Sequence, residues 1–172
     1  MSRLEPHAHS PSGLCGGPRS QARKRVGVAE YAVDTDRSLS TSGLGSCVAV
    51  AVYEPGGIGG LLHAMLPRAE DVPGGHDAKC VDTGIAALYE DLRAGGANTE
   101  RLAAKLAGGS AMLDLTGPAI GDRNVAVARE TLAECDIPVL ATDVGGKRGR
   151  SVCLSVPDGD LRVRCGDTTT VL

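Results

Sequence analysis

Cysteine and histidine are the residues of this chain best suited to nucleophilic or metal chemistry, and the sequence has six of the first and four of the second. The cysteines stand at positions 15, 47, 80, 135, 153 and 165, and no two of them form a C-x-x-C pair. This spacing does not indicate a zinc site, so we expect no metal and no other cofactor. The N-terminus lacks the apolar segment of a secretory signal, so we expect a cytoplasmic protein with six reduced thiols.

One cysteine lies at a junction that suits a nucleophile. In "TSGLGSCVAV", residues 41–50, Cys47 stands between a glycine-rich turn and an apolar run. A catalytic thiol needs partial exposure, a nearby base and oriented hydrogen-bond donors. Cys80, in the first turn of a predicted helix, is another position that lowers a thiol pKa, but its only neighbouring histidine is loop residue His76. The alternative for Cys47 is a small buried core residue, which is the commoner role of cysteine.

His63 is the only histidine inside a predicted apolar strand, and it is the candidate base for Cys47. The two apolar runs around the glycine turn at 55–60 form a hairpin, with Tyr53 opposite Ile58. In this register Cys47 lies opposite Ala64, and His63 is a diagonal neighbour at about 7–8 Å. The register is open by a residue or more, so the pattern predicts compatibility with a contact, and a buried core histidine is the alternative.

The glycines before Cys47 supply a third part of such a site. Gly43 and Gly45 tolerate positive φ and allow backbone N–H groups to approach a substrate closely. We expect Gly43, Gly45 and Ser46 to form an oxyanion or substrate loop beside the thiol, although the glycines could also serve only to shape a turn. The stretch "GGKRGRS" has the wrong spacing for a phosphate-binding loop.

The elements that must position these residues follow from the apolar pattern. Continuous apolar runs predict buried strands, and apolar residues at three- and four-residue spacing predict two helices. Because strands and helices do not alternate strictly, we expect an α/β (α+β) fold with mixed β-sheet layers and two main helices. Residues 1–24 predict a disordered tail and residues 25–172 a single domain. The strands are predicted at 26–34, 46–54, 58–67, 101–109, 138–146 and, as a hairpin turning at Asp158–Gly159, 150–165, and the helices at 77–96 and 120–137.

Charge and composition exclude several partners. Residues 1–25 hold five basic residues and one acidic residue, whereas the whole chain has a net charge of −3, so residues 26–172 carry −7. An acidic body with only three aromatic residues does not suit a nucleic acid. No apolar run approaches the roughly 20 residues of a membrane helix, so we expect no direct membrane insertion.

Several ordered blocks between Val26 and Val163 match the pattern of one known family. They are "VGVAEYAV", "TSGLGSCVAVAVYEP", "GGLLHAMLP", "KCVDTGIAAL", "RLAAKLAGGSAM", "IGDRNV" and "DVGGKRGRSV". Through them the chain resembles CheD, the chemoreceptor glutamine deamidase of bacterial and archaeal chemotaxis. The resemblance implies an amidohydrolase that converts glutamine side chains of chemoreceptor cytoplasmic domains to glutamate.

The resemblance also implies roles for particular residues. The nucleophile of the family's "T-x-G-L-G-S-C" block is Cys47 here, its "H-x-M-L-P" base is His63, and the threonine of its triad is Thr41. The family's α/β fold has a catalytic arrangement similar to that of cytotoxic necrotizing factor toxins. Its members also bind CheC, a phosphatase.

Two alternatives to a deamidase stay open on the sequence alone. The protein could act mainly as a non-catalytic adaptor that binds and stimulates the CheC phosphatase, because the triad would look the same. A redox-sensing thiol at Cys47 or Cys80 is the other, although the spacing identifies no resolving cysteine.

Overall fold

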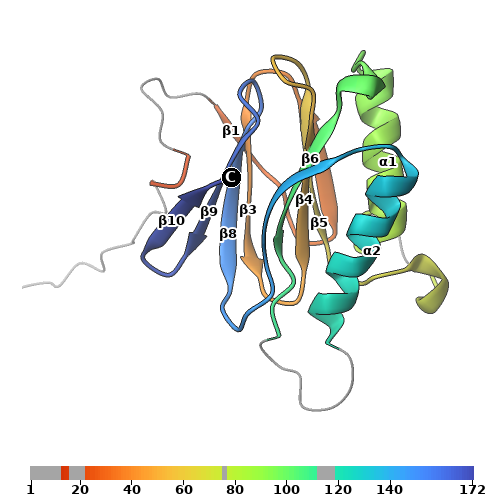
Figure 1. Ribbon diagram of the computed structural model, residues 1–172, viewed down its shortest axis with the longest axis vertical. Coiled ribbons are helices and arrows are strands. Elements are labelled where there is room, and N and C mark those ends of the chain that lie inside the picture. The colour runs from red at the N-terminus through yellow and green to blue at the C-terminus, as the bar shows by residue number, and fades with distance from the viewer. Residues whose placement is uncertain (1–12, 16–21, 75–76, 112–118) are drawn as a thin grey trace, which may run out of the picture.

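The computed structural model describes residues 13–15, 22–74, 77–111 and 119–172. Within these ranges the chain forms three layers: two helices, a central sheet and an outer sheet (Figure 1). The central sheet has the order β2 (Glu30–Asp34), β5 (Gly59–Ala64), β4 (Val48–Tyr53), β6 (Ala103–Gly108) and β7 (Val139–Val144). The outer sheet has the order β1 (Arg23–Arg25), β3 (Ser38–Leu44), β8 (Arg150–Ser155), β9 (Asp160–Cys165) and β10 (Thr168–Val171).

Both sheets are mixed, which confirms the predicted fold class. The β1–β3 and β6–β7 pairs are parallel, and the remaining pairs are antiparallel. All residues of β4, β5 and β6 are buried, because the helices cover one face of the central sheet and the outer sheet covers the other. Val48, Val50 and Val52 pack under the helices, whereas the smaller Ala49 and Ala51 face the outer sheet.

The two predicted helices are confirmed as α1 (Val81–Ala94) and α2 (Ile120–Glu134). The start of the first differs from the prediction, since Cys80 is its N-cap residue and Asp77 lies in a preceding 3-10 turn (Asp77–Lys79). Gly95 is its C-cap residue, one position before the predicted end at 96. Two further 3-10 turns span Ala69–Asp71 and Thr99–Arg101. Among the described residues, no helix has the length and apolar character needed to cross a membrane.

Strand β3 was not predicted, because its sequence SLSTSGL carries only a weak apolar alternation. Its inward side chains are those of Leu39 and Thr41, and a bulge between Thr41 and Leu44 turns Leu44 inward as well. Gly43 lies in this bulge with φ +74°, a conformation that favours glycine. Residues expected in a turn therefore belong to a strand of the outer sheet. Strands β1 and β10 were also missed, and the strand predicted over 26–34 is shorter, beginning only at Glu30.

The described part of the N-terminal region lies on the domain. Leu14 is buried, Cys15 forms a disulfide with Cys153 of β8, and β1 begins at Arg23. The expectation of six reduced thiols is therefore wrong for this pair, which the sequence could not reveal because the two cysteines are 138 residues apart. The rest of the predicted tail, residues 1–12 and 16–21, lies outside the described residues, so its disorder stays a prediction.

The disulfide leads to two expected results, one for the number of free thiols in the unreduced protein and one for the stability of a variant without the cross-link. Denatured, unreduced protein is expected to titrate four thiols, because Cys47, Cys80, Cys135 and Cys165 are free. Cys15→Ser is expected to lower the free energy of unfolding by about 2–4 kcal/mol, since the cross-link restricts the unfolded chain. Denaturant titration measures this, with Cys165→Ser as the control. Six titratable thiols in the unreduced protein would contradict the pairing.

Candidate active site

The candidate catalytic residues meet between the two sheets. Thr41 on β3 of the outer sheet and His63 on β5 of the central sheet are both buried, and Thr41 Oγ1 lies 2.7 Å from His63 Nδ1. This hydrogen bond spans the interior from one sheet to the other. With the proton on Nδ1, Nδ1–H donates to the hydroxyl and Nε2 carries the lone pair of a base. The structure therefore brings two of the three predicted residues into contact.

Cys47 lies on the same face as His63, but in a different register from the one predicted. Tyr53 pairs with Gly59 and not with Ile58, so the hairpin is shifted by one residue and His63 lies opposite Ala49. Cys47 precedes Ala49 by two positions and packs against the cluster between the sheets. Because side chains two apart in a strand share a face, Cys47 and His63 are diagonal neighbours.

The second ring nitrogen of His63 is available for a proton. Nε2 is buried and has no hydrogen-bond partner among the described residues, so no hydrogen bond joins it to the Cys47 thiol. A buried polar atom without a partner is uncommon in a native protein, and a catalytic role or a bound water or ion accounts for such an atom. Hydrogen bonds of catalytic pairs often tighten only when substrate binds.

The loop Gly45–Cys47 carries the chain from the outer to the central sheet. Backbone hydrogen bonds from the residues just after β6 fix its position. Gly109 N–H donates to the Cys47 carbonyl at 2.8 Å, and Ser110 N–H donates to the Gly45 carbonyl at 2.9 Å. Gly108, with φ +101°, permits this approach, because a Cβ there would lie 2.4 Å from the Cys47 carbonyl oxygen.

The same loop offers backbone donors beside the thiol. Gly45 N–H donates to the Gly43 carbonyl at 3.1 Å, whereas the Ser46 and Cys47 N–H groups donate to no other residue within the described part of the chain. Gly43 has the positive φ that was expected, but Gly45 does not. The free donors therefore belong to Ser46 and Cys47, and the glycines shape the loop that presents them.

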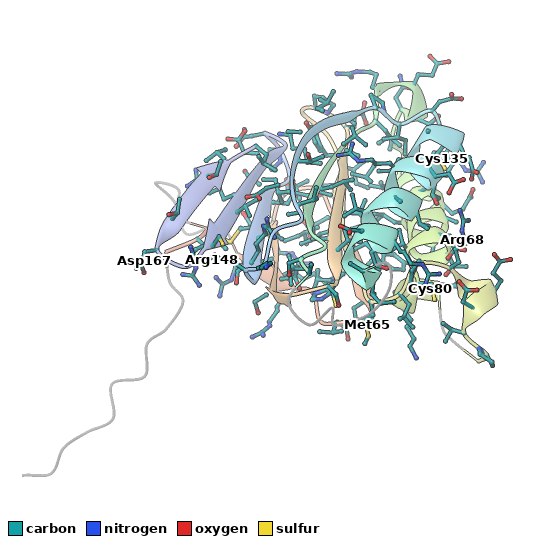
Figure 2. All side chains as sticks on the ribbon, turned by 60° about the horizontal axis from the view of Figure 1, so that its bottom comes forward. Met65, Arg68, Cys80, Cys135, Arg148 and Asp167 are labelled. Atoms are coloured by element: carbon teal, nitrogen blue, oxygen red, sulfur yellow. A yellow bond between two sulfur atoms is a disulfide. The ribbon has the colours of Figure 1, made fainter. Side chains whose placement is uncertain are left out.

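Asn124 of α2 is a site-supporting residue that sequence reasoning missed. Its Nδ2 donates to the Ser46 carbonyl at 2.8 Å and to the Met65 carbonyl at 3.0 Å, and its side chain is fully buried. It therefore ties the loop before Cys47 to the chain just after His63. Met65 lies at the end of the molecule that Figure 2 turns toward the viewer. The available signal was a polar residue one helical turn, four positions, before Ala128 on the apolar stripe of the predicted helix 120–137.

Burial keeps both reacting groups neutral. Desolvation raises the pKa of the half-buried Cys47 thiol above its ordinary value, opposed in part by its own backbone N–H. Desolvation also lowers the pKa of His63 to about 4. At neutral pH the site holds a thiol and a neutral imidazole, and not a preformed ion pair. Cys80 is fully buried with a raised pKa, which does not suit a reactive thiol.

The lowered pKa of His63 makes stability depend on pH. The imidazole of the unfolded chain takes up a proton near pH 6.5 and that of the folded chain near pH 4, so the unfolded state holds more protons between these values. The free energy of unfolding is expected to fall by about 3 kcal/mol as the pH drops from 7 to 4. Urea titrations of wild type and His63→Gln measure this contribution. The same pH dependence in both proteins would contradict it.

Comparison with known proteins places this chain in a chemotaxis family. The family model CheD, described as CheD chemotactic sensory transduction, matches residues 65–165, a span that begins after Thr41, Cys47 and His63. A "Probable chemoreceptor glutamine deamidase CheD" from Haloarcula marismortui is 48% identical over 153 residues, covering 87% of this chain and 88% of that protein. The "Chemoreceptor glutamine deamidase CheD" of Thermotoga maritima is 42% identical over 147 residues, covering 83% and 91%. The chain belongs to the CheD family.

Proposed function

We propose that this protein hydrolyses the side-chain amide of glutamine residues in the cytoplasmic domains of chemoreceptors, giving glutamate and ammonia. The names of its relatives supply the substrate. The observation that carries the chemistry is the buried Thr41–His63 hydrogen bond, with an unpartnered Nε2 on the face that Cys47 shares. We place the reaction in the cytoplasm, and a CheC-type phosphatase remains a proposed partner.

The proposed reaction starts from the neutral pair. His63 Nε2 takes the proton of Cys47 as the sulfur attacks the carbonyl carbon of the glutamine amide. The N–H groups of Ser46 and Cys47 donate to the oxyanion that forms. The imidazolium then gives its proton to the leaving nitrogen, and ammonia departs from a thioester. Water, deprotonated by the same imidazole, hydrolyses the thioester to glutamate and restores the thiol.

Incubation with a glutamine-bearing chemoreceptor domain tests the proposal. Mass spectrometry is expected to show conversion of an amide to a carboxyl group at specific glutamines, with release of an equal amount of ammonia. An unmodified receptor after prolonged incubation with folded, reduced protein would exclude the function for that receptor. Retained binding to a CheC-type phosphatase in that case would favour the adaptor alternative.

Thr41 is proposed to orient His63 and to fix its tautomer. A neutral hydrogen bond contributes about 0.5–1.5 kcal/mol, so Thr41→Ala is expected to slow turnover roughly tenfold. Thr41→Ser is expected to recover most of the activity because it keeps the hydroxyl, whereas Thr41→Val, which has a similar shape, is not. Steady-state kinetics of the three variants measure this. A Thr41→Ala protein that is folded but fully inactive would require a direct role for Thr41 at the substrate.

A further inference from the structure

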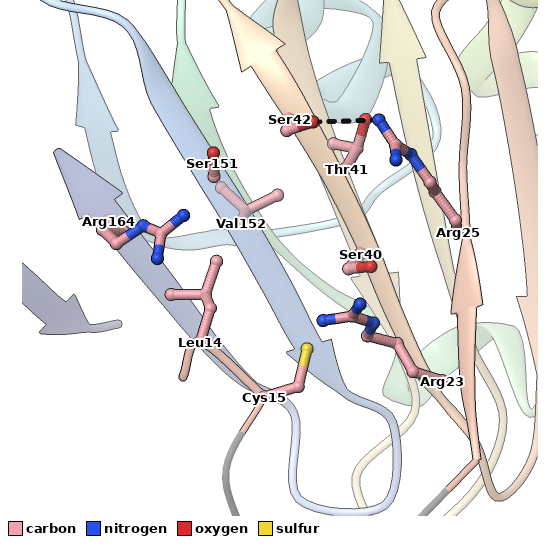
Figure 3. A pocket seen from close by; sticks show the side chains of 10 residues that line it. All are labelled: Leu14, Cys15, Arg23, Arg25, Ser40, Thr41, Ser42, Ser151, Val152 and Arg164. Carbon is pink, nitrogen blue, oxygen red and sulfur yellow. Dashed lines mark hydrogen bonds between the residues drawn. The ribbon is translucent and has the colours of Figure 1, made fainter. Parts of the chain in front are cut away.

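The solvent face of the outer sheet carries a basic pocket that the proposed chemistry does not use. Three arginines and three serines line it: Arg23, Arg25, Arg164, Ser40, Ser42 and Ser151 (Figure 3). The serines lie on β3 and β8, on the face opposite to the buried Leu39 and Val152. Leu14, beside the Cys15 disulfide, adds an apolar wall.

The arginine side chains converge on the serines from both sides. In Figure 3, Arg23 and Arg25 extend from β1 toward β3, and Arg164 extends from β9 toward β8. Arg25 Nη2 donates to Ser42 Oγ at 3.4 Å. Within the described ranges none of the three guanidinium groups forms an ion pair with a carboxylate. The ion pairs present engage Arg37, Arg68, Arg93, Arg101, Arg123 and Arg150.

Three uncompensated cations close together are unusual on a chain whose net charge is −3. A local cluster of one sign attracts ligands of the opposite sign, and the planar guanidinium group matches a carboxylate with two parallel hydrogen bonds. The backbones of β1 and β9 are three strand spacings apart, about 14 Å. This breadth suits a row of carboxylates on a peptide better than one small anion.

The pocket lies next to the candidate active site. Thr41, whose hydroxyl contacts His63, also lines the pocket, on the other side of β3. Ser42 precedes Cys47 by five residues, so their Cα atoms are at most about 17 Å apart. A peptide lying across the pocket in extended form therefore reaches the thiol within about five residues.

We propose that this arginine pocket binds glutamate or aspartate side chains of the protein substrate close to the target glutamine. The identity of the ligand rests on the proposed function. The pocket adds a rule to that function, because it selects which glutamines are modified. Glutamines with acidic neighbours within about five residues are preferred over glutamines in neutral segments. The pocket acts in binding and takes no part in the reaction at Cys47.

Two synthetic peptides with one glutamine each test this rule, one with three glutamates among the five residues on either side and one with serines in their place. The acidic peptide is expected to show the lower KM with wild type, and the difference is expected to shrink as NaCl is raised. Arg25→Gln and Arg164→Gln are each expected to raise KM for the acidic peptide about two- to fivefold, with kcat and the serine peptide unaffected.

Arg129→Gln is the matched control, because Arg129 is exposed on α2, in the helical layer on the far side of the central sheet. It removes the same charge and is expected to change neither peptide's KM. If both peptides are processed with equal KM and the pocket variants behave like the control, the pocket inference is overturned and the deamidase proposal stands.

A binding experiment without turnover tests the pocket in the case where the deamidase proposal itself fails. The acidic peptide, labelled with a fluorophore, is titrated with Cys47→Ala protein, and inorganic phosphate is added as a competitor. Arginine-dependent binding of the peptide supports the pocket even if wild type processes neither peptide, an outcome that would count against the deamidase proposal alone. Displacement of the peptide by phosphate at equal concentration would show a general anion site and overturn the inference.

Discussion

Replacing Cys47 by alanine is expected to abolish ammonia release from receptor glutamines without unfolding the protein. The side chain is half-buried beside the cluster between the sheets, and the smaller alanine fits in its place just before β4. Loss of the nucleophile removes the covalent route altogether. In hydrolases that form an acyl intermediate, such a loss costs about 10⁴-fold or more in kcat. A coupled ammonia assay measures the loss, with circular dichroism to confirm the fold.

The other free cysteines supply the controls for this experiment. Cys80→Ala and Cys135→Ala are expected to keep most of the activity, because the Cys80 thiol is fully buried and Cys135 lies at the end of α2. Cys47→Ser is expected to be nearly as inactive as Cys47→Ala, since a hydroxyl loses its proton far less readily than a thiol. Full activity in Cys47→Ala would rule out the thiol mechanism.

The strand that follows Cys47 and the strand that carries His63 were predictable, because burial on both faces leaves a continuous apolar run in the sequence. Strand β4 within 46–54 and β5 within 58–67 were found in this way. Their register was wrong by one residue, since the turn between them, and not the apolar pattern, sets it. This shift of the register matters, because the observed pairing puts Cys47 and His63 on one face of the sheet.

The partner of His63 was not predictable from the residue pattern. Thr41 and His63 belong to different sheets, and their contact depends on how two layers pack, which leaves no periodic signal in either strand. Strand β3 also hides its inward positions, because a serine-rich sequence interrupted by a bulge does not alternate cleanly. Thr41 was named through resemblance to a family, and the geometry now gives that choice a physical contact.

The contacts of Asn124 and the disulfide also could not be predicted from the sequence pattern. Asn124 contacts two carbonyl groups from segments 78 and 59 residues away, and Cys15 pairs with a cysteine 138 residues away. Local patterns predict elements, whereas such contacts arise only once the elements are packed. The predicted nucleophile loop, by contrast, lies in one short stretch, and its free N–H groups are found at Ser46 and Cys47, close to where they were expected.

Replacing His63 by alanine is expected to slow deamidation by about 10²–10⁴-fold, the usual contribution of a general acid–base group. Two losses add to this effect, since the thiol then has no base to take its proton and the leaving nitrogen has no donor. His63→Gln is the matched variant, because its side chain is polar, fills much of the same space and cannot carry the proton. Turnover rates for both variants, measured on folded protein, are expected to lie above that of Cys47→Ala and below that of Thr41→Ala.

The pH profile distinguishes a base from a merely structural histidine. With the pKa of His63 lowered to about 4, wild-type kcat/KM is expected to be almost flat from pH 5 to neutral pH. Without the imidazole, only thiolate formed by ionisation in water attacks the amide. The rate of His63→Ala should therefore rise about tenfold per pH unit until the raised pKa of Cys47 is reached. If His63→Ala keeps the flat wild-type profile and loses only a constant factor, His63 supports the fold of the site and does not move the proton.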